Sequence, residues 1–194
     1  MKYIGRELKG SYLYIKKQFI FELIKTIILF LMAFGLYYIG VSTLGTKKSL
    51  WSVFAVLAML PAAKSLVGVI MFARYKSLSL EQYKLYKEAA GDISIIVENV
   101  ITTEKKSYYL PCIACENNTI IAYCNVSNSS MLKPLNEHLE NVLKLGGYTS
   151  ATLKIFDKED AFLARLKQMN QNLEYSEKKA STEAIFTTIK AVSL

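Results

Sequence analysis

The chain has 194 residues, of which 52% are hydrophobic, and it carries 24 Lys and Arg against 16 Asp and Glu. The excess positive charge is confined to residues 1–74, which hold ten basic and two acidic side chains, whereas residues 75–194 hold fourteen of each. A neutral C-terminal part lacks the basic surface that phosphate binding requires, so we expect no nucleic-acid partner. The basic N-terminal part instead predicts a lipid bilayer with an anionic inner leaflet as the partner.

The first segment, residues 1–18, is basic and places apolar side chains three to four positions apart, at Tyr3, Ile4, Leu8, Tyr12 and Ile15. This spacing is typical of an amphipathic helix on a membrane surface. The alternative is a basic flank without regular structure, which Gly5 and Gly10 favour because glycine weakens a helix.

Residues 19–74 predict a transmembrane hairpin. Uncharged residues cover 26–45, and a second apolar stretch covers 50–73. At 1.5 Å per residue, each stretch crosses a hydrocarbon core of roughly 30 Å. Ten basic residues flank the hairpin and two, Lys47 and Lys48, lie in its turn. This asymmetry predicts a multi-pass protein of a bacterial cell membrane with both termini in the cytoplasm.

The second span contains Lys64, and an ionised lysine near mid-bilayer costs about 2.5–3.5 kcal/mol. Helical spacing puts Lys64 opposite a face of small residues that suits packing on the first helix, namely Ser52, Ala55, Ala58, Ala62 and Ser65. Pro61 frees the carbonyl of Leu57, which lies on the Lys64 face and could accept a hydrogen bond from the ammonium. In the alternative interpretation, Lys64 marks a homo-oligomer contact through this helix, or a site for an anionic ligand or lipid.

Residues 75–175 predict a cytoplasmic α+β domain, and residues 176–194 a linker with a last helix. The expected order is helix 80–90, an antiparallel meander of strands 93–101, 107–116 and 119–126, a helix from Ser130 to Gly146, strand 150–156, a helix capped by Asp157, and a helix capped by Thr182. The predicted fold class is therefore a membrane α-helical hairpin with an α+β domain.

Three cysteines are the first candidates for chemistry. Cys112 and Cys115 form a CxxC pair, but they lie on a predicted strand, where positions three apart point to opposite faces. Thioredoxin chemistry needs a helix N-terminus, and zinc needs four ligands, whereas the only histidine, His138, falls on an exposed helix flank. We expect Cys112, Cys115 and Cys124 to be buried free thiols, with no metal and no cofactor.

No set of residues converges on a recognisable catalytic site. The leading hypothesis is a non-enzymatic, membrane-anchored binding or regulatory module for an unidentified protein or small ligand, with Lys64, Pro61 and Leu57 as the candidate intramembrane site. The alternative is a membrane-associated enzyme whose site combines scattered side chains, Asp92, Glu98, Tyr108 and Tyr123.

Four features together, the basic Tyr-rich leader, LPAAKS in the second span, TLKIF and IKAVSL, resemble small two-helix membrane proteins of low-GC Gram-positive bacteria. Some of those proteins carry an O-linked GlcNAc transferase-like name, but this chain has no nucleotide-sugar motif and no helical repeats.

The order helix, three strands, helix, strand also resembles the restriction-endonuclease-like core. That family needs an Asp and a (D/E)xK on adjacent strands, and the only candidate here, residues 104–106, falls in a turn. This resemblance implies an inactive copy.

Overall fold

The computed structural model describes residues 9–44, 50–104, 106–126, 132–172 and 179–194. The chain divides into two compact units, and the division does not follow the sequence order. Residues 15–76 form one unit, whereas residues 1–14 join residues 77–194 in the other. The two units are called the hairpin unit and the α+β unit below.

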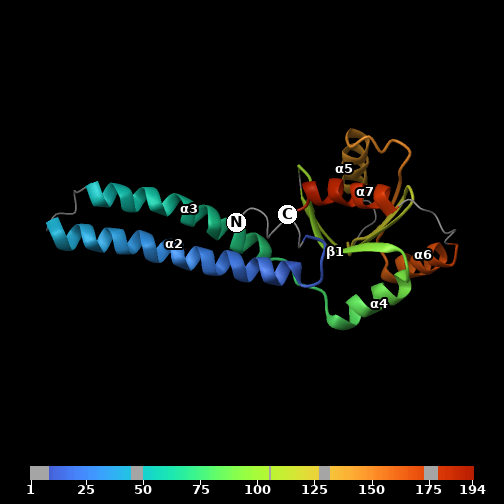
Figure 1. Cartoon of the computed structure of the whole chain (residues 1–194), viewed down its shortest axis with the longest axis horizontal. Coiled ribbons are helices and arrows are strands. Elements are labelled where there is room, and N and C mark those ends of the chain that lie inside the picture. The colour runs from blue at the N-terminus through green and yellow to red at the C-terminus, as the bar shows by residue number, and fades with distance from the viewer. Residues whose placement is uncertain (1–8, 45–49, 105, 127–131, 173–178) are drawn as a thin grey trace. The chain divides into compact units, whose positions relative to one another are not determined.

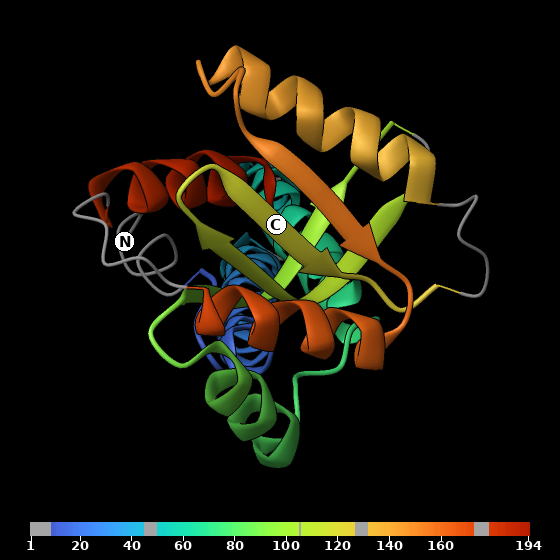
Figure 2. The same cartoon turned by 90° about the vertical axis from the view of Figure 1, so that its right-hand side faces the viewer.

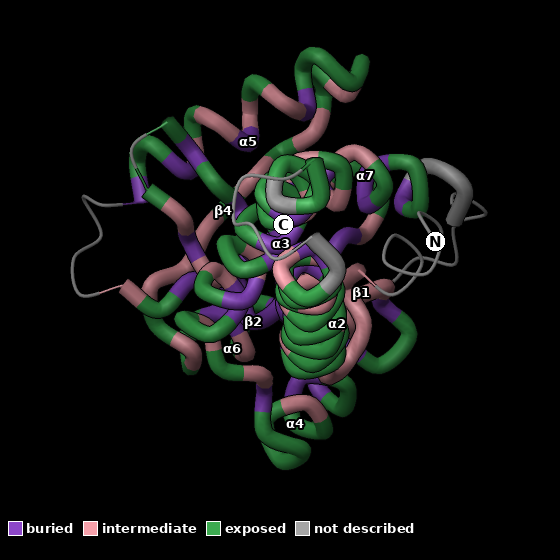
Figure 3. The backbone as a smooth tube through the Cα atoms, turned by 90° about the vertical axis from the view of Figure 1, so that its left-hand side faces the viewer, coloured by how far each residue is buried: buried purple, intermediate pink, exposed green. Residues whose placement is uncertain are grey.

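The hairpin unit consists of α2 (Tyr14–Leu44) and α3 (Leu50–Ala73), both long and apolar enough to cross a membrane. The bounds of α3 agree with the predicted span, whereas α2 starts before its uncharged stretch. The small-residue face is confirmed, because Ala55, Ala62 and Ser65 are at most 5% exposed. The other faces of α2 and α3 are largely exposed along their length (Figure 3). The prediction that α3 packs through small side chains therefore holds.

A polar cluster joins α2 to α3 and fixes their register. The Ser65 hydroxyl donates to the carboxylate of Glu22 and accepts from the hydroxyl of Thr26, both over 2.9 Å. Thr26 also lies 2.7 Å from the carbonyl oxygen of Glu22, and Lys25 forms an ion pair with that carboxylate. Ser65 on α3 is thus level with Thr26 on α2.

The α+β unit has a mixed sheet of four strands in the order β1-β2-β3-β4. Its elements are α4 (Leu80–Ala90), β1 (Ser94–Thr102), β2 (Ser107–Glu116), β3 (Thr119–Tyr123), α5 (Lys133–Leu145), β4 (Thr152–Phe156), α6 (Glu159–Gln171) and α7 (Lys179–Val192). The predicted antiparallel meander is present, and β4 adds parallel to β3 after the crossover through α5.

Helices cover both faces of this sheet (Figures 1 and 2). One buried cluster joins the sheet to α4 and α6 through Tyr86, Phe162 and Leu166. The other joins it to α5 and α7 through side chains such as Leu139 and Ile185. Because the sheet is buried on both sides, the sequences of β1 and β2 are nearly continuous apolar runs.

Several element boundaries differ from those predicted. Helix α4 and strand β2 have the predicted bounds, and Ser79 forms a capping box with Gln82. In contrast, Asp157 does not cap α6, whose N-cap is Lys158. Thr182 does not begin the last helix either, since it lies inside α7 with a buried side chain. The proposed cap Ser130 lies outside the described residues.

The predicted leader helix is wrong for residues 9–13, whereas residues 14–18 of the leader are helical as the start of α2. Residues 1–8 lie outside the described part, and residues 9–13 form turns that precede α2. Gly10 and Leu13 have φ values of 81° and 62°, which a right-handed helix does not allow. We call residues 9–13 the strap, because they pack on the α+β unit instead of continuing α2.

Candidate functional site

The two edges of the sheet differ in whether other segments form hydrogen bonds with them. Along β1, Val97 N donates to the strap carbonyl of Gly10 over 3.0 Å, and Leu194 N donates to Val100 O over 2.9 Å. At the other edge, β4 pairs with β3, and no strand within the described residues pairs with its outer side. An open edge strand presents unpaired backbone groups that another chain can use.

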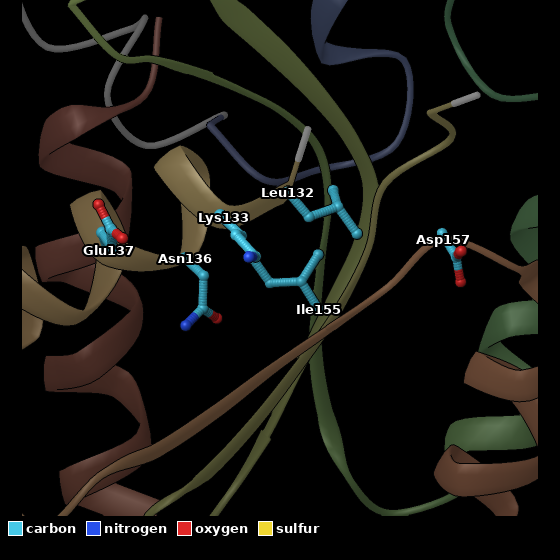
Figure 4. A pocket seen from close by; sticks show the side chains of 6 residues that line it. All are labelled: Leu132, Lys133, Asn136, Glu137, Ile155 and Asp157. Atoms are coloured by element: carbon cyan, nitrogen blue, oxygen red, sulfur yellow. The ribbon is translucent and has the colours of Figure 1, made fainter. Parts of the chain in front are cut away.

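Beside the end of β4 lies a hollow of about 300 Å³ (Figure 4). It is lined by Leu132, Lys133, Asn136, Glu137, Ile155 and Asp157. Figure 4 shows Lys133 and Asn136 extending from α5 toward the side on which Ile155 lies. The hollow therefore occupies the space between one helix and the edge strand.

A second hollow, of about 280 Å³, lies beside the start of β4. It is lined by Glu140, Leu143, Lys144, Tyr148, Thr149, Ala151, Thr152 and Leu153. The same two elements, α5 and β4, thus border both hollows, which we call together the α5–β4 groove. Each hollow is at or below the lower limit of the roughly 300–1,000 Å³ typical of small-molecule sites. Each one suits a single side chain of a larger partner better than a whole cofactor.

The wall of the groove is a polar stripe of α5. Lys133, Asn136, Glu140 and Lys144 recur every three to four residues, and so they lie on one face of the helix. Asn136 Nδ2 donates to Glu140 Oε1 over 2.5 Å, which orders the middle of this stripe. Because basic and acidic side chains alternate along the wall, a polyanion such as a nucleic acid finds no uniform positive surface there.

A separate polar centre is formed by Glu98 on β1, whose side chain is only 1% exposed. Its carboxylate accepts from Leu13 N at 3.1 Å, Leu78 N at 2.9 Å and the hydroxyl of Ser77 at 3.2 Å. Leu13 precedes the hairpin unit in the sequence, and Ser77 follows it. One carboxylate therefore anchors both chain segments that connect the two units.

Glu98 also marks a change of face within the sheet. Val97 and Ile101 are four residues apart and would share a face in a regular strand, but they belong to opposite buried clusters. The same change occurs on β2 between Leu110 and Cys112, on either side of Pro111. Glu98 has a φ of 55°, and this left-handed residue lies opposite Pro111 between two paired positions. The backbone at Glu98 is therefore held in a conformation that costs free energy.

The structure leaves the candidate intramembrane site without a hydrogen bond. Lys64, Pro61 and Leu57 lie on an exposed face of α3, as predicted. Among the residues that the structure describes, none accepts a hydrogen bond from the Lys64 ammonium, and this includes the carbonyl of Leu57. The hydrogen bond from Lys64 to this carbonyl is thus not formed within the described residues, and the role of Lys64 stays a prediction.

All three cysteines are buried and free. Cys112 belongs to the cluster under α4 and α6, whereas Cys115 and Cys124 belong to the opposite one, as predicted for a strand. Burial raises the pKa of Cys112, and it raises the pKa of Cys115 to about 12 and that of Cys124 to about 11. Since the thiolate is the reactive form, these side chains are poor nucleophiles and poor metal ligands.

The residues named for an enzymatic site do not come together. Tyr108 and Tyr123 belong to clusters on opposite faces of the sheet, and Asp92 is exposed after α4. The carboxylate of Glu98 already accepts hydrogen bonds from backbone N–H groups. His138 is half-buried rather than exposed, and its Nε2 has no hydrogen-bond partner within the described residues. This arrangement gives no support to a site built from that set.

The groove residues were missed in the sequence because no pattern distinguishes a groove wall from a solvated helix face. Lys133, Glu137 and Glu140 look like ordinary exposed charges of an amphipathic helix. The only available signal was Lys154 within the β4 pattern, since lysine is common on edge strands.

Comparison with protein-family models, with curated proteins and with solved structures finds no match to this chain.

Proposed function

We propose that this protein is a membrane-anchored, non-enzymatic binding module whose α+β unit binds another protein through the α5–β4 groove. The observation that carries the proposal is the open strand β4 with a hollow at each end, in a sheet whose other edge is covered by the chain itself. The alternative, a membrane-associated enzyme, has less support, because Tyr108 and Tyr123 belong to buried clusters on opposite faces of the sheet.

Topology supports a location of this unit in the cytoplasm. The strap and residues 77–194 belong to one compact unit, which supports a hairpin that the chain enters and leaves on the same side of a membrane. The basic flanks identify that side as the cytoplasmic one by the positive-inside rule. The two arguments are independent, since one uses packing and the other uses charge.

The test is site-specific photo-crosslinking in intact cells. A photoreactive amino acid replaces Asn136 or Lys144 in the groove, and replaces the exposed Glu88 of α4 as the control. We expect a discrete cross-linked product from the two groove positions and none from position 88. A chain that stays monomeric from all three positions would contradict a protein-binding role for the groove.

For Lys64, the register between the helices favours contact with lipid over contact with another protomer. Lys64 is adjacent to Ser65, which is level with Thr26 at the start of the uncharged stretch of α2. From Leu50 to Lys64 the helix rises about 21 Å, so in a core of roughly 30 Å Lys64 lies on the inner side of the centre, about 6 Å from the centre and about 9 Å from the inner boundary. A lysine at that depth can extend toward anionic headgroups.

A further inference from the structure

We infer that the partner binds as an extended segment that adds a fifth strand next to β4 and places two side chains in the two hollows. This inference rests on the proposed function, because it specifies what kind of protein segment the α5–β4 groove holds. It assigns the affinity to backbone hydrogen bonds and the selectivity to the hollows.

The backbone of β4 has the geometry for strand addition. Thr152 N donates to Asn118 O over 2.7 Å, and Phe156 O accepts from Cys124 N over 3.0 Å. In a strand, successive residues direct their backbone groups to opposite sides. Because Thr152 and Phe156 face β3, the N–H and C=O groups of Leu153 and Ile155 face outward. Two residues on this edge can therefore form a ladder with an added strand.

The hollows match the side-chain repeat of such a strand. Leu153 lines one hollow and Ile155 lines the other, and both pack on the cluster under α5 and α7. In paired strands, residues opposite one another place their side chains on the same face. Side chains opposite Leu153 and Ile155 would thus be two residues apart and would point under α5, one into each hollow.

The lining indicates the chemistry of these two side chains. Leu143 and Leu153 contribute apolar surface to one hollow, and Leu132 and Ile155 to the other. Polar groups come from the α5 wall in both hollows, from Asp157 in one, and from Tyr148, Thr149 and Thr152 in the other. We therefore expect apolar side chains at the two inward positions and polar residues between and around them.

The β1 edge shows that this sheet accepts other segments of the chain through backbone hydrogen bonds. Gly10 and Leu194 each form a hydrogen bond with the outer edge of β1, and Ile101 pairs with Ser193 in an antiparallel bridge. There the covering segments belong to the same chain. At β4 no described segment does so, which leaves that edge for a partner.

The test uses two libraries of fluorescent nine-residue peptides and the full-length protein in lipid nanodiscs. In the first library, two residues chosen from Val, Ile, Leu and Phe are separated by one polar residue. In the control library, the same two residues are adjacent, so that they point to opposite faces of a strand. We expect members of the first library to bind at least about tenfold more tightly by fluorescence anisotropy.

Two variants test whether binding uses the edge of β4. Leu153→Pro removes an outward N–H and leaves the pairing with β3 intact, as proline on an edge strand does. It should weaken binding of the selected peptides at least tenfold. Lys154→Ala changes an exposed side chain that lines neither hollow, and it should bind them like the wild type.

Amide hydrogen exchange of the wild type keeps the test decisive if Leu153→Pro does not fold. A bound peptide should slow exchange at Leu153 and Ile155, and unchanged exchange at both would overturn strand addition. Equal binding of the two libraries would overturn it too. If cross-links from the groove positions persist after either result, the proposed protein-binding role of the groove is retained and only binding by strand addition is refuted. If the wild type is a dimer and Leu153→Pro is a monomer, the segment that binds next to β4 belongs instead to a second copy of this chain.

Discussion

The backbone N–H of Leu13 donates to Glu98 Oε1 over 3.1 Å, and the two residues are 85 positions apart. Both have left-handed backbone conformations, with φ values of 62° and 55°. Such a conformation costs a residue with a side chain roughly 1–2 kcal/mol. The strained pair persists because one buried carboxylate satisfies several donors at once, and it is where the strap is fixed to the sheet.

Replacing Glu98 by Gln should release the strap. The amide of glutamine keeps one acceptor oxygen but places an NH₂ group where the carboxylate accepted hydrogen bonds. Charged hydrogen bonds contribute about 1.5–3 kcal/mol each, so we expect the free energy of unfolding to fall by about 2–4 kcal/mol. Denaturant unfolding of the full chain in detergent measures this. The exposed Glu88→Gln is the control, and equal stability of both variants would refute the role of Glu98.

Gly10→Ala should destabilise the strap in a second way. A β-carbon at Gly10 would lie 2.9 Å from Lys190 Cε and 3.0 Å from Ile96 Cβ, at a φ of 81° that favours glycine. We expect a loss of about 1–3 kcal/mol and faster tryptic cleavage after Lys9. Gly35→Ala is the matched control, because nothing lies within 4 Å of its added β-carbon and alanine favours a helix. Equal protease resistance of the two variants would contradict the prediction.

Ala62→Leu should separate α2 from α3. Ala62 is fully buried in the small-residue face, and overpacking at such a site costs about 1–3 kcal/mol. Its neighbour Ala63 is exposed, so Ala63→Leu should leave stability unchanged. The fluorescence of Trp51, the only tryptophan, reports unfolding of the hairpin in an SDS titration. Indistinguishable transitions for the two variants would argue against this packing face.

The buried thiols predict a loss of stability at alkaline pH. Burial raises the pKa of Cys115 to about 12 and that of Cys124 to about 11, and it also raises the pKa of Cys112. Unfolded thiols ionise near a pKa of about 8.5. The folded state therefore binds more protons than the unfolded state above that pH. Stability is fully present below about pH 8.5 and declines as the pH rises toward the folded pKa values.

The measurement is denaturant unfolding between about pH 8 and 9.5, below the ordinary tyrosine pKa of about 10. We expect a loss of roughly 1 kcal/mol per thiol over this range. The triple variant Cys112→Ala, Cys115→Ala, Cys124→Ala should lose this dependence whatever its stability at pH 8. A triple variant with the wild-type slope would show that other groups cause it.

Lys64→Leu should leave the hairpin folded, because Lys64 lies opposite the face that contacts α2. If Lys64 binds anionic headgroups, the variant should copurify with less acidic lipid, which mass spectrometry of nanodisc or detergent samples quantifies. Lys64→Arg keeps the charge and serves as the control. If cross-linked dimers in native membranes disappear in Lys64→Leu while bound lipid is unchanged, the oligomer interpretation is the correct one.

Local signals predicted the elements whose ends are set by neighbouring residues. Helix α4 has its predicted bounds because Ser79 and Gly91 terminate it through their own backbone and side-chain bonds. The bounds of α3 follow from an apolar stretch with no competing pattern. Predicting these bounds requires only the residues within a few positions of each end.

Distant contacts decided the rest. The strap has the spacing of an amphipathic helix, but Glu98 and Val97, far along the sequence, hold it in turns through hydrogen bonds to Leu13 and Gly10. Helix α7 begins before Thr182, whose side chain is buried and does not cap the helix. The α5–β4 groove exists only because β4 pairs parallel to β3 and becomes an edge, and nothing in TLKIF specifies its neighbour.

The strap has a consequence for synthesis of the protein. Lys9 donates to the carbonyl oxygens of Lys190 and Ser193, the first of them 181 positions later in the chain. At about 5–20 residues per second, a ribosome adds that acceptor roughly 10–35 s after Lys9. The hairpin is made during this interval, and so it can enter the membrane while the strap still lacks its final partners. Closure of the sheet edge would then be the last event, so that completion of the α+β unit follows formation of the hairpin.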